Sequence, residues 1–538
     1  MEDDMKKKIS AFVIMLLVSG FVFSGTFGDR EKRAIRSFLS DGDYIEYVSD
    51  EDESSFIKVS TVRNVTARGD KLTVHYINGE QETFIWGTIE NDSKNNLVVY
   101  KTKKPAYEFP KTVHETNATN GGKVLNICVW NEEFQSRVKK YYPGYNVIDD
   151  TIGDVKVNWI IIPYQGNAYQ DYLDMALASQ ASANDDSKID MFLIEPDYAL
   201  KYTDTPYPLD IKADLGFTDA DLSKQFKYTK DIATAGGKLK ALTWQCCPGG
   251  LIYRRSIAKD VLGTDDPDRV QALLSDWTKF DKVAELAKSK GYYMVSGPDD
   301  NYRAFSNNKK SPWVVNGKIT VDNSIRKWAT QQKLYTDKGY SNGAGLWSQE
   351  QWYGAKYGKV FCYFGPAWFI DFSLAPQVGD AYSGSYGDWA FCKGPQGFFW
   401  GGTCICAAAG TDNIDLIKDI MSKLCTDDTI MTRIAKEEGD FVNNENAMTA
   451  VAKSDYGNPF LGGQNHIKFF IDIAKSLDMT TISPYDQGMD EEIQAAMNEC
   501  FIGRQGWYYT SGYRIDESAA WENFYRSVIE RYPNLTRW

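Results

Sequence analysis

Residues 124–142, "VLNICVWNEEFQSRVKKYY", decide the fold of the main body of this chain. The first seven residues are almost all apolar and predict a buried strand. The twelve that follow, "NEEFQSRVKKYY", predict a helix directly after it. A strand followed at once by a helix is the repeating unit of an α/β fold.

The same alternation continues along the chain. "VKVNWIIIP" (155–163) predicts a strand, "NAYQDYLDMALASQ" (167–180) a helix, and "KIDMFLIE" (188–195) a third strand. Near-continuous apolar runs of this length favour a parallel sheet covered on both faces. Ligands of such sheets bind at the carboxyl ends of the strands. Polar and aromatic residues stand at those ends, in "WNE" (130–132), "PYQ" (163–165) and "EPD" (195–197).

Further strands are expected at 238–245, 249–257, 291–297, 359–365 and 388–395, with helices between them. In "DNIDLIKDIMSKLC" (412–425) the apolar residues fall on one helical face, and Asp412 or Asn413 is placed to cap the helix. The chain has 538 residues, too many for one compact core. The expected fold class is therefore α/β with two lobes.

The N-terminal part has a different pattern. Three lysines precede an apolar run and small residues, so residues 1–28 predict a secretory signal peptide or an uncleaved N-terminal anchor. Residues 30–110 contain alternating β-branched and aromatic runs, with "NG" at 78–79 as a hairpin turn, and predict a small all-β module. The polar stretch 111–122 is typical of a linker.

Composition narrows the class of partner. The net charge is −13 and the isoelectric point about 5.0, which argues against nucleic acid. Aromatic residues make up 14% of the chain, with 15 Trp and 33 Tyr, more than a core alone requires. Rings with a polar tip suit binding surfaces that are half apolar and half wet. The nine cysteines lack the spacing of a disulfide framework, and free thiols are expected.

Motifs for metal, cofactor or nucleophilic chemistry are absent from the sequence. It has three histidines and contains no HExxH, CxxC, P-loop or GxGxxG pattern. "GYSNG" (339–343) matches a nucleophile elbow in letters, but the polar "KLYTDK" precedes it where an apolar strand is needed. We therefore expect no catalytic residue, no metal and no cofactor.

Paired carboxylates keep one enzymatic alternative open. Asp299 with Asp300, Glu195 with Asp197, and Asp486 with Asp490 are pairs of the kind used in glycoside hydrolysis. With 73 acidic residues in the chain, such pairs also arise by chance.

A different constellation recurs: Trp or Tyr stands beside Asp, Asn, Gln or Gly at predicted strand ends. A sugar ring has an apolar face that an aromatic ring covers and hydroxyls that carboxylates and amides bind, so this mixture favours a sugar site. The stretch 398–413, "FFWGGTCICAAAGTDN", is the sharpest case. Gly401 and Gly402 would let a ligand approach the backbone beside Trp400, although a bulge would also explain them.

The chain resembles the bacterial extracellular solute-binding proteins of carbohydrate ABC transporters, the family of maltose-binding protein. Four blocks carry the resemblance across about residues 123–538: "LNICVWNEEFQSRVKKYYPGY" (125–145), "GGKLKALTWQCCPGGLIYRRSIAKDVLG" (236–263), "YGKVFCYFGPAWFIDF" (357–372) and "WGGTCICAAAGTDNIDLIKDIMSKL" (400–424). The resemblance implies a two-lobed periplasmic-binding-protein-like fold with crossing hinge strands. Lobe 1 would be 123–243 plus 403–456, lobe 2 would be 248–400 plus 460–538, and the hinge would fall near 243–247, 400–403 and 457–463.

The resemblance implies a function without catalysis: a sugar is captured between the lobes by hinge closure and delivered to ABC permease subunits by a monomeric, exported protein. Relatives in Gram-positive bacteria carry a lipobox Cys after the signal, which this sequence lacks, so retention would depend on an uncleaved anchor, a periplasm or a partner. A peptide or polyamine ligand stays an alternative. The residues matched to the family's contact loops are Trp130, Asn131, Glu132, Glu195, Asp197, Trp244, Gln245, Asp299, Asp300, Tyr302, Trp368, Trp400, Gly401, Tyr485 and Asp486.

Overall fold

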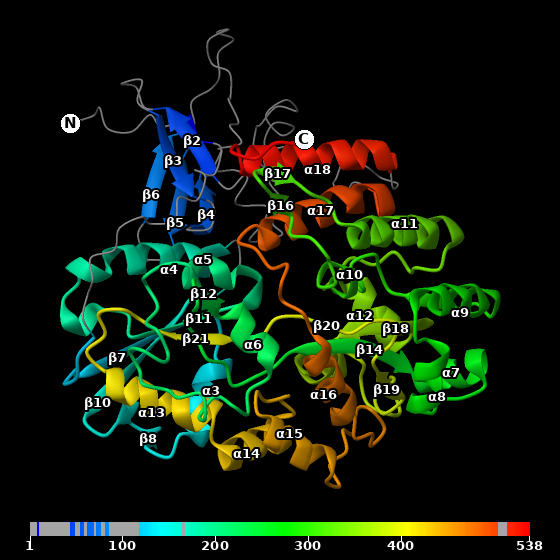
Figure 1. Ribbon diagram of the computed structural model, residues 1–538. Coiled ribbons are helices and arrows are strands. Elements are labelled where there is room, and N and C mark those ends of the chain that lie inside the picture. The colour runs from blue at the N-terminus through cyan, green and yellow to red at the C-terminus, as the bar shows by residue number, and fades with distance from the viewer. Residues whose placement is uncertain are drawn as a thin grey trace. The chain divides into compact units, whose positions relative to one another are not determined.

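The computed structural model describes residues 118–163, 167–503 and 514–537, together with the backbone of short strands nearer the N-terminus (Figure 1). The chain divides into two compact units, Met1–Tyr107 with Ile161–Ala176, and Glu108–Ile160 with Leu177–Trp538. The apolar run of the predicted signal or anchor, the last part of the predicted β module (86–110) and residues 111–117 of the predicted linker lie outside the described residues.

The first unit contains two three-stranded antiparallel sheets among its described residues. In one of them β5 pairs with β4 and β6, and the antiparallel register joins His75 to Gln81. The hairpin predicted around "NG" is therefore confirmed, although its turn residues lie outside the described part. The strands are β1 (Lys8–Ile9), β2 (Tyr44–Val48), β3 (Ser54–Lys58), β4 (Val62–Arg68), β5 (Lys71–Tyr76) and β6 (Gln81–Ile85).

Lobe 1, in the second unit, is built on a six-stranded sheet with the order β21-β11-β7-β10-β9-β8. β7 and β11 are parallel, as predicted, and β11 and β21 are buried along their whole length. β21 is antiparallel to β11, so the expected all-parallel sheet is wrong at this edge, because β21 enters the sheet on the chain's return from lobe 2. The strands are β7 (Val124–Val129), β8 (Tyr145–Asn146), β9 (Thr151–Ile152), β10 (Val155–Ile161), β11 (Met191–Ile194) and β21 (Cys404–Ala407).

Helix α3 (Glu133–Tyr141) follows β7 as the sequence predicted and packs against α13 (Ile414–Cys425) and α14 (Asp428–Glu438). Asn413 occupies the N-cap of α13, but its side chain does not cap the helix. Its amide donates instead to the carbonyl of Val124 (2.9 Å) and to Asp190 (3.1 Å), so it joins the helix start to the sheet. Smaller elements complete this part: η3 (Gln180–Ser182), η4 (Asp185–Ser187), η5 (Pro196–Tyr198), α5 (Ala199–Thr203), α6 (Lys227–Ile232), β12 (Thr234–Ala235), β13 (Lys238–Leu239) and α15 (Glu445–Ala452). Helix α4 (Ala168–Ser179) belongs to the first unit up to Ala176.

Lobe 2 is built on a second sheet, with the order β15-β18-β14-β19 and β20 paired to β14. The strand predicted at 249–257 ends early, at Arg254, and α7 begins at Arg255. The strands of this sheet and the helices around it are β14 (Pro248–Arg254), α7 (Arg255–Leu262), α8 (Pro267–Leu273), α9 (Trp277–Ser289), β15 (Tyr293–Val295), α12 (Gln349–Lys356), β18 (Val360–Gly365), the π-helical η6 (Phe369–Leu374), η7 (Ala375–Gln377), β19 (Trp389–Cys392), β20 (Phe398–Phe399) and α16 (Ile467–Ser476).

A helical cluster completes lobe 2. Trp313, Trp328 and Phe524 are fully buried in it, together with residues from both ends of the lobe's sequence. Many rings that the composition predicted for binding surfaces thus serve this core. The elements of the cluster are α10 (Tyr302–Ser306), β16 (Val314–Val315), β17 (Lys318–Ile319), α11 (Asn323–Lys338), α17 (Asp486–Phe501) and α18 (Glu517–Arg531).

Two antiparallel segments cross between the lobes side by side. Leu242 pairs with Ile405 at the lobe 1 end, and Pro248 pairs with Phe399 at the lobe 2 end. Between these pairs the amide of Trp400 donates to the carbonyl of Cys247 (3.0 Å). The chain passes between the lobes a third time through a turn in which Asn458 pairs with Gln464, and α16 then packs against β14.

All nine cysteines are buried free thiols. Within the part of the chain that the structure describes, no helix has both the length and the apolar character needed to cross a bilayer. In the same part, no group of three or more His, Cys, Asp or Glu is arranged to hold a metal ion.

Candidate functional site

An ion pair joins the two lobes directly. Asp197, in η5 after β11, accepts hydrogen bonds from both terminal nitrogens of Arg303 on α10, at 2.6 Å (Nη1–Oδ1) and 2.5 Å (Nη2–Oδ2). Both side chains are about one-fifth exposed, at 22% and 19%. Such bidentate pairing is strong and directional, so these two residues fix the edge of lobe 1 against lobe 2.

Arg303 was not predicted from the sequence. Its guanidinium carbon lies 5.7 Å from the centre of the Trp400 ring, within the range of a cation–π contact. Arg303 stands one position after Tyr302 in "GPDDNYR", a stretch in which only the acidic residues and the tyrosine were predicted to bind ligand. The position of a basic residue next to two acidic ones could have indicated that it forms an ion pair.

Glu195 lies beside this pair at the end of β11. Its carboxyl is partly exposed and has no hydrogen-bond partner among the described residues. Burial and the negative charge of Asp197 raise its pKa to about 8, with Arg303 opposing them. At pH 7 the group is therefore mostly a neutral acid, which can both donate to and accept from a hydroxyl.

Tryptophan rings gather next to Arg303. The centre of the Trp400 ring lies 5.0 Å from that of Trp368 and 5.6 Å from that of Trp347. Trp368 donates through Nε1 to the backbone carbonyl of Trp400 (3.0 Å), and Phe369 packs 5.8 Å from Trp400. We call Trp347, Trp368 and Trp400 the tryptophan cluster.

Gly401 has a different role from the one predicted. It adopts a positive φ of 69°, and an added Cβ would lie 3.4 Å from Nε1 of Trp368. Trp368 occupies the space beside the glycine backbone in which a ligand was predicted to bind. Gly401 therefore brings two rings of the cluster together.

Trp347 is a member of the cluster that sequence reasoning missed. It is 47% exposed and has a φ of 65°, a backbone conformation that a bulky residue rarely adopts. Its amide donates to Gln351 Oε1 (2.8 Å) on α12, which holds the conformation. Strain of this kind persists where the surroundings fix it, often at ligand sites. No periodic pattern in "GAGLWSQ" reveals it.

Trp130, Asn131 and Glu132 lie at the carboxyl end of β7, as predicted. Trp130 is half-buried and the other two are exposed. Asn131 Oδ1 accepts from the amide of Glu133 (3.0 Å), which ties this turn to the start of α3. The next residue, Glu133, was not predicted, although burial and the charge of Asp440 raise its pKa to about 7.

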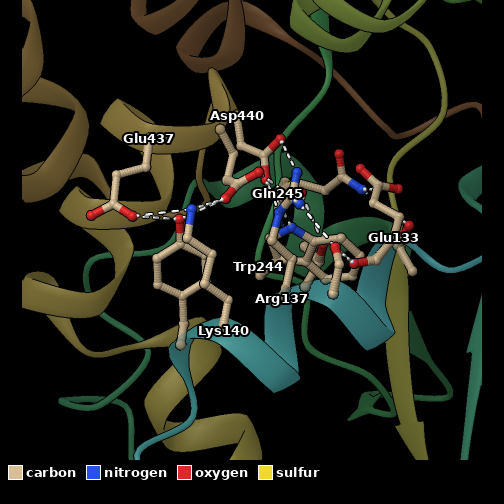
Figure 2. A network of polar contacts seen from close by, with 12 residues as sticks. Glu133, Arg137, Lys140, Trp244, Gln245, Glu437 and Asp440 are labelled. Atoms are coloured by element: carbon tan, nitrogen blue, oxygen red, sulfur yellow. Dashed lines mark hydrogen bonds and ion pairs between the residues drawn. The ribbon is translucent and has the colours of Figure 1, made fainter. Parts of the chain in front are cut away.

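Trp244 and Gln245 belong to the joint between the crossing segments rather than to an open wall. Figure 2 shows them in a polar network with α3. Trp244 is 1% exposed and stacks on Phe134 with the ring centres 5.3 Å apart. Gln245 Nε2 donates to Glu133 (3.4 Å) and to Thr403 on the returning segment (3.1 Å). The ligand contact predicted for Trp244 is wrong in this arrangement, because neither ring face is free.

The centre of that network is a buried ion pair. Arg137 on α3 forms two hydrogen bonds to Asp440, at 2.8 Å (Nε–Oδ2) and 3.0 Å (Nη2–Oδ1), and also pairs with Glu438 at 3.1 Å. The indole of Trp244 approaches the same Asp440 carboxylate at 3.4 Å. The network therefore anchors one crossing segment firmly to lobe 1.

Asp299, Asp300 and Tyr302 face into lobe 2, contrary to their predicted role. Asp300 is 6% exposed and accepts from the amides of Ser296 (2.7 Å) and Gly297 (3.0 Å); burial raises its pKa to about 7. Asp299 accepts from Asn498 (2.9 Å), and burial raises its pKa to about 6. Tyr302 is fully buried. These polar groups satisfy the lobe's own backbone and helices.

Tyr302 and two late-loop residues meet the edge of the same helical cluster. Tyr302 donates to Asp490 (2.6 Å). Tyr485 packs against Tyr532 with ring centres 5.1 Å apart, and Asp486 pairs with Lys309 at 3.4 Å.

A cavity of about 30 Å³, large enough for a water molecule, lies between η5 and lobe 2. Pro196, Asp197 and Leu200 line it from lobe 1, and residues of lobe 2 line the rest: Arg303, Ser306, Asn307, Lys309, Phe399, Asp478, Met479, Thr481, Ile482, Ser483, Asp486 and Asp490. Asp486 therefore lies near the interlobe ion pair, whereas Tyr485 is packed on the helices. This cavity is too small to hold a sugar ring.

Two α/β lobes, paired crossing segments and a polar and aromatic site between the lobes define a two-lobed binding protein. Residues 149–455, more than half of the chain, match the family described as bacterial extracellular solute-binding protein. The chain belongs to this family. The resemblance drawn from the sequence blocks is confirmed, and with it the fold class.

Solved structures share this fold across most of the chain. A crystal structure described as an extracellular solute-binding protein of family 1 has a TM-score of 0.62 at 17% identity, covering 76% of this chain and 99% of its own. The sugar-binding protein MalE from Xanthomonas citri has a TM-score of 0.57 at 14% identity (76% and 97% covered). A galacto-N-biose/lacto-N-biose I-binding protein from Bifidobacterium longum has 0.55 at 13% (77% and 97%). No sequence among the curated proteins matches.

Proposed function

We propose that this chain is the extracellular sugar-binding component of an ABC importer. The observation that carries the proposal is the position of Trp400. It stands on a crossing segment and contacts Trp347 and Trp368 of lobe 2 together with Arg303, which is bound to Asp197 of lobe 1. Aromatic faces beside charged and neutral hydrogen-bonding groups are what a sugar ring requires.

The solved relatives support the choice of ligand. MalE from Xanthomonas citri is named a sugar-binding protein, and the Bifidobacterium longum protein was crystallised with lacto-N-biose. In the proposed cycle a sugar enters the open form, contacts both lobes and stabilises the closed form. The closed form is then recognised by permease subunits. We further propose that the protein is an exported monomer, that lobe 1 spans 123–243 plus 403–456, and that lobe 2 spans 248–400 plus 460–538.

The direct test is calorimetry against a panel of oligosaccharides. We expect at least one member to bind with a Kd on the order of micromolar, which corresponds to about −8 kcal/mol. Trp400→Ala should weaken that binding by roughly tenfold or more, since it removes a ring and its support for Trp368 and Arg303. Trp521→Ala, at the edge of the helical cluster, is the matched control. If no oligosaccharide of the panel gives a binding signal, the sugar proposal is refuted.

A cationic ligand such as a polyamine is the second candidate. The unpartnered carboxyl of Glu195, with Asp197 and Glu133 close to it in charge interaction, favours it. A cation would need Glu195 ionised, so its binding should release a proton and strengthen as pH rises through about 8. A neutral sugar should show no such gain. Calorimetry in buffers of different ionisation enthalpy measures the released proton directly.

One of the three carboxylate pairs considered for a hydrolase, Asp299 with Asp300, is turned away from any substrate. Asp300 binds backbone amides of its own loop and Asp299 binds Asn498, so neither carboxyl is presented to a substrate. We therefore propose binding without turnover. Incubation of bound oligosaccharides with the protein should return them uncleaved by chromatography.

A further inference from the structure

An exposed group of aromatic rings lies outside the tryptophan cluster. Among the described residues, the large hydrophobic side chains that are exposed elsewhere are aliphatic, for example Ile148 and Leu286. The exposed aromatic ones all fall between residues 347 and 382. Besides Trp347 they are Tyr353 (67% exposed), Tyr357 (55%), Phe372 (55%) and Tyr382 (101%), which we call the aromatic strip.

The residues of the strip come from elements that pack on one another. Tyr353 on α12 and Tyr357 at the C-cap of that helix are four residues apart, with ring centres 5.3 Å apart. The ammonium of Lys356 lies 4.8 Å from the Tyr357 ring, and its Cε would lie 2.8 Å from a Cβ built on Gly379. The turn that carries Tyr382 is thus adjacent to α12.

That turn holds the backbone of Tyr382, whose side chain is fully exposed. Asp380 Oδ1 accepts from the amides of Tyr382 (2.8 Å) and Ser383 (2.7 Å), and the Asp380 carbonyl accepts from Gly384 (3.0 Å). The backbone of Tyr382 is therefore already ordered, so that a partner covering the ring would restrict only its side-chain torsions.

The strip is continuous with the tryptophan cluster. Trp352, next to Tyr353 on α12, lies 5.8 Å from Trp347 and 6.3 Å from Phe369 between ring centres. Phe372 and Phe369 both belong to the π-helical η6. Helix α12 therefore carries one ring, Trp352, against the tryptophan cluster and another, Tyr353, that belongs to the strip.

We propose that the aromatic strip is a second carbohydrate-binding surface, which holds the outer units of a glycan chain whose end occupies the proposed site. The inference rests on the proposed sugar binding and extends it to the length of the ligand. Among the described residues, no large aliphatic side chain between 347 and 382 is exposed. Tyrosine rings without such neighbours in the sequence suit sugar faces better than the mixed apolar core of a protein interface. The expected ligand class is an oligosaccharide longer than the closed cleft accommodates.

The test compares ligand lengths. Calorimetry is done on the full chain with malto-, cello- and xylo-oligosaccharides of two to six units, and with the variant Tyr353→Ser/Tyr357→Ser/Tyr382→Ser. All three side chains are exposed, so the variant should fold. In the series that binds, we expect the wild type to hold the six-unit chain about tenfold more tightly than the two-unit chain, and the variant to hold both equally. Ile148→Ser/Leu286→Ser, which removes exposed aliphatic surface, should behave as wild type.

The outcomes separate the two proposals. If short sugars bind and chain length makes no difference to the wild type, the strip proposal fails and sugar binding stands. The strip proposal also fails if the triple variant keeps the full gain with length, or if it loses only capture by vesicles containing the permease, which would mark a protein-docking surface. If no oligosaccharide of any length binds either protein, both proposals fall.

Discussion

Trp347 combines a strained backbone with a ring that belongs to the proposed sugar site. Its φ of 65° is costly for any side chain, by about 1–2 kcal/mol, whereas glycine adopts it freely. Trp347→Ala and Trp347→Gly both remove the ring, and both should lose sugar affinity. We expect the alanine variant to be less stable than the glycine variant by about 1 kcal/mol. Urea denaturation measures the difference, and equal stability would show that the backbone is not strained.

Glu195 provides a prediction about pH. Its pKa rises from the model-peptide value of 4.5 to about 8 in the folded protein, so the folded state binds more protons than the unfolded state between those values. Its contribution to stability should therefore be fully present below about pH 4.5 and be lost as pH rises through about 8. Glu195→Gln should remove this slope.

The measurement is the difference in Tm between wild type and Glu195→Gln across pH 4 to 9. The variant should become relatively more stable as pH increases. Glu285→Gln, an exposed carboxylate change on α9, is the control. A constant difference across the range would mean that Glu195 titrates normally.

At this scale the sequence indicated which residue types form the site better than it indicated which way they point. Glu195 and Asp197 follow β11 and Trp368 follows β18, whereas ligand contact by these residues and by Trp400 stays a prediction. Asp300 and Tyr302 come from an equally polar loop, yet they turn inward to satisfy backbone amides and Asp490. The orientation of a loop side chain depends on partners far away in sequence, and no local pattern records it.

At the scale of elements, the pair Arg137–Asp440 fixes α3 to the loop after α14. Both side chains are 4% exposed. Arg137→Met should destabilise the protein by about 3–5 kcal/mol, because it leaves a buried carboxylate without its partner. The double variant Arg137→Met/Asp440→Leu should recover much of that loss. Urea denaturation checks both.

The control for this pair is an exposed one of the same kind. Arg433 and Glu437 pair within α14 at 3.2 Å with both side chains well exposed, so Arg433→Gln should cost less than about 1 kcal/mol. Equal effects of Arg137→Met and Arg433→Gln would contradict the assigned importance of the buried network.

Elements were predictable where apolar runs are long. The strands at 124–129, 191–194 and 360–365 form as predicted, since their burial on both faces is written into their composition. The segment 238–245 was predicted as a strand but keeps only Lys238–Leu239, because beyond it Leu242 and Gln245 form single bridges to two different segments, at Ile405 and Val442. The antiparallel direction of β21 depends on the path through lobe 2, which local pattern cannot express.

For the whole molecule, the Asp197–Arg303 pair predicts a closed resting state. Arg303→Gln should weaken the link between the lobes and shift the unliganded protein toward the open form. Small-angle X-ray scattering should then give a larger radius of gyration for the variant than for the wild type. After saturation with a ligand the two should agree. An unliganded wild type that is already as open as the variant would show that the pair does not hold the lobes together.

The burial of all nine sulfur atoms has a practical consequence. Burial raises the pKa of the Cys392 and Cys404 thiols to about 12, and the other cysteines are shielded in the same way. Reagents that attack thiolates should therefore not modify the cysteines of the native protein. A cysteine introduced at Glu350, an exposed position at the start of α12, would take a maleimide dye selectively and turn the chain into a fluorescent sensor of its own ligand.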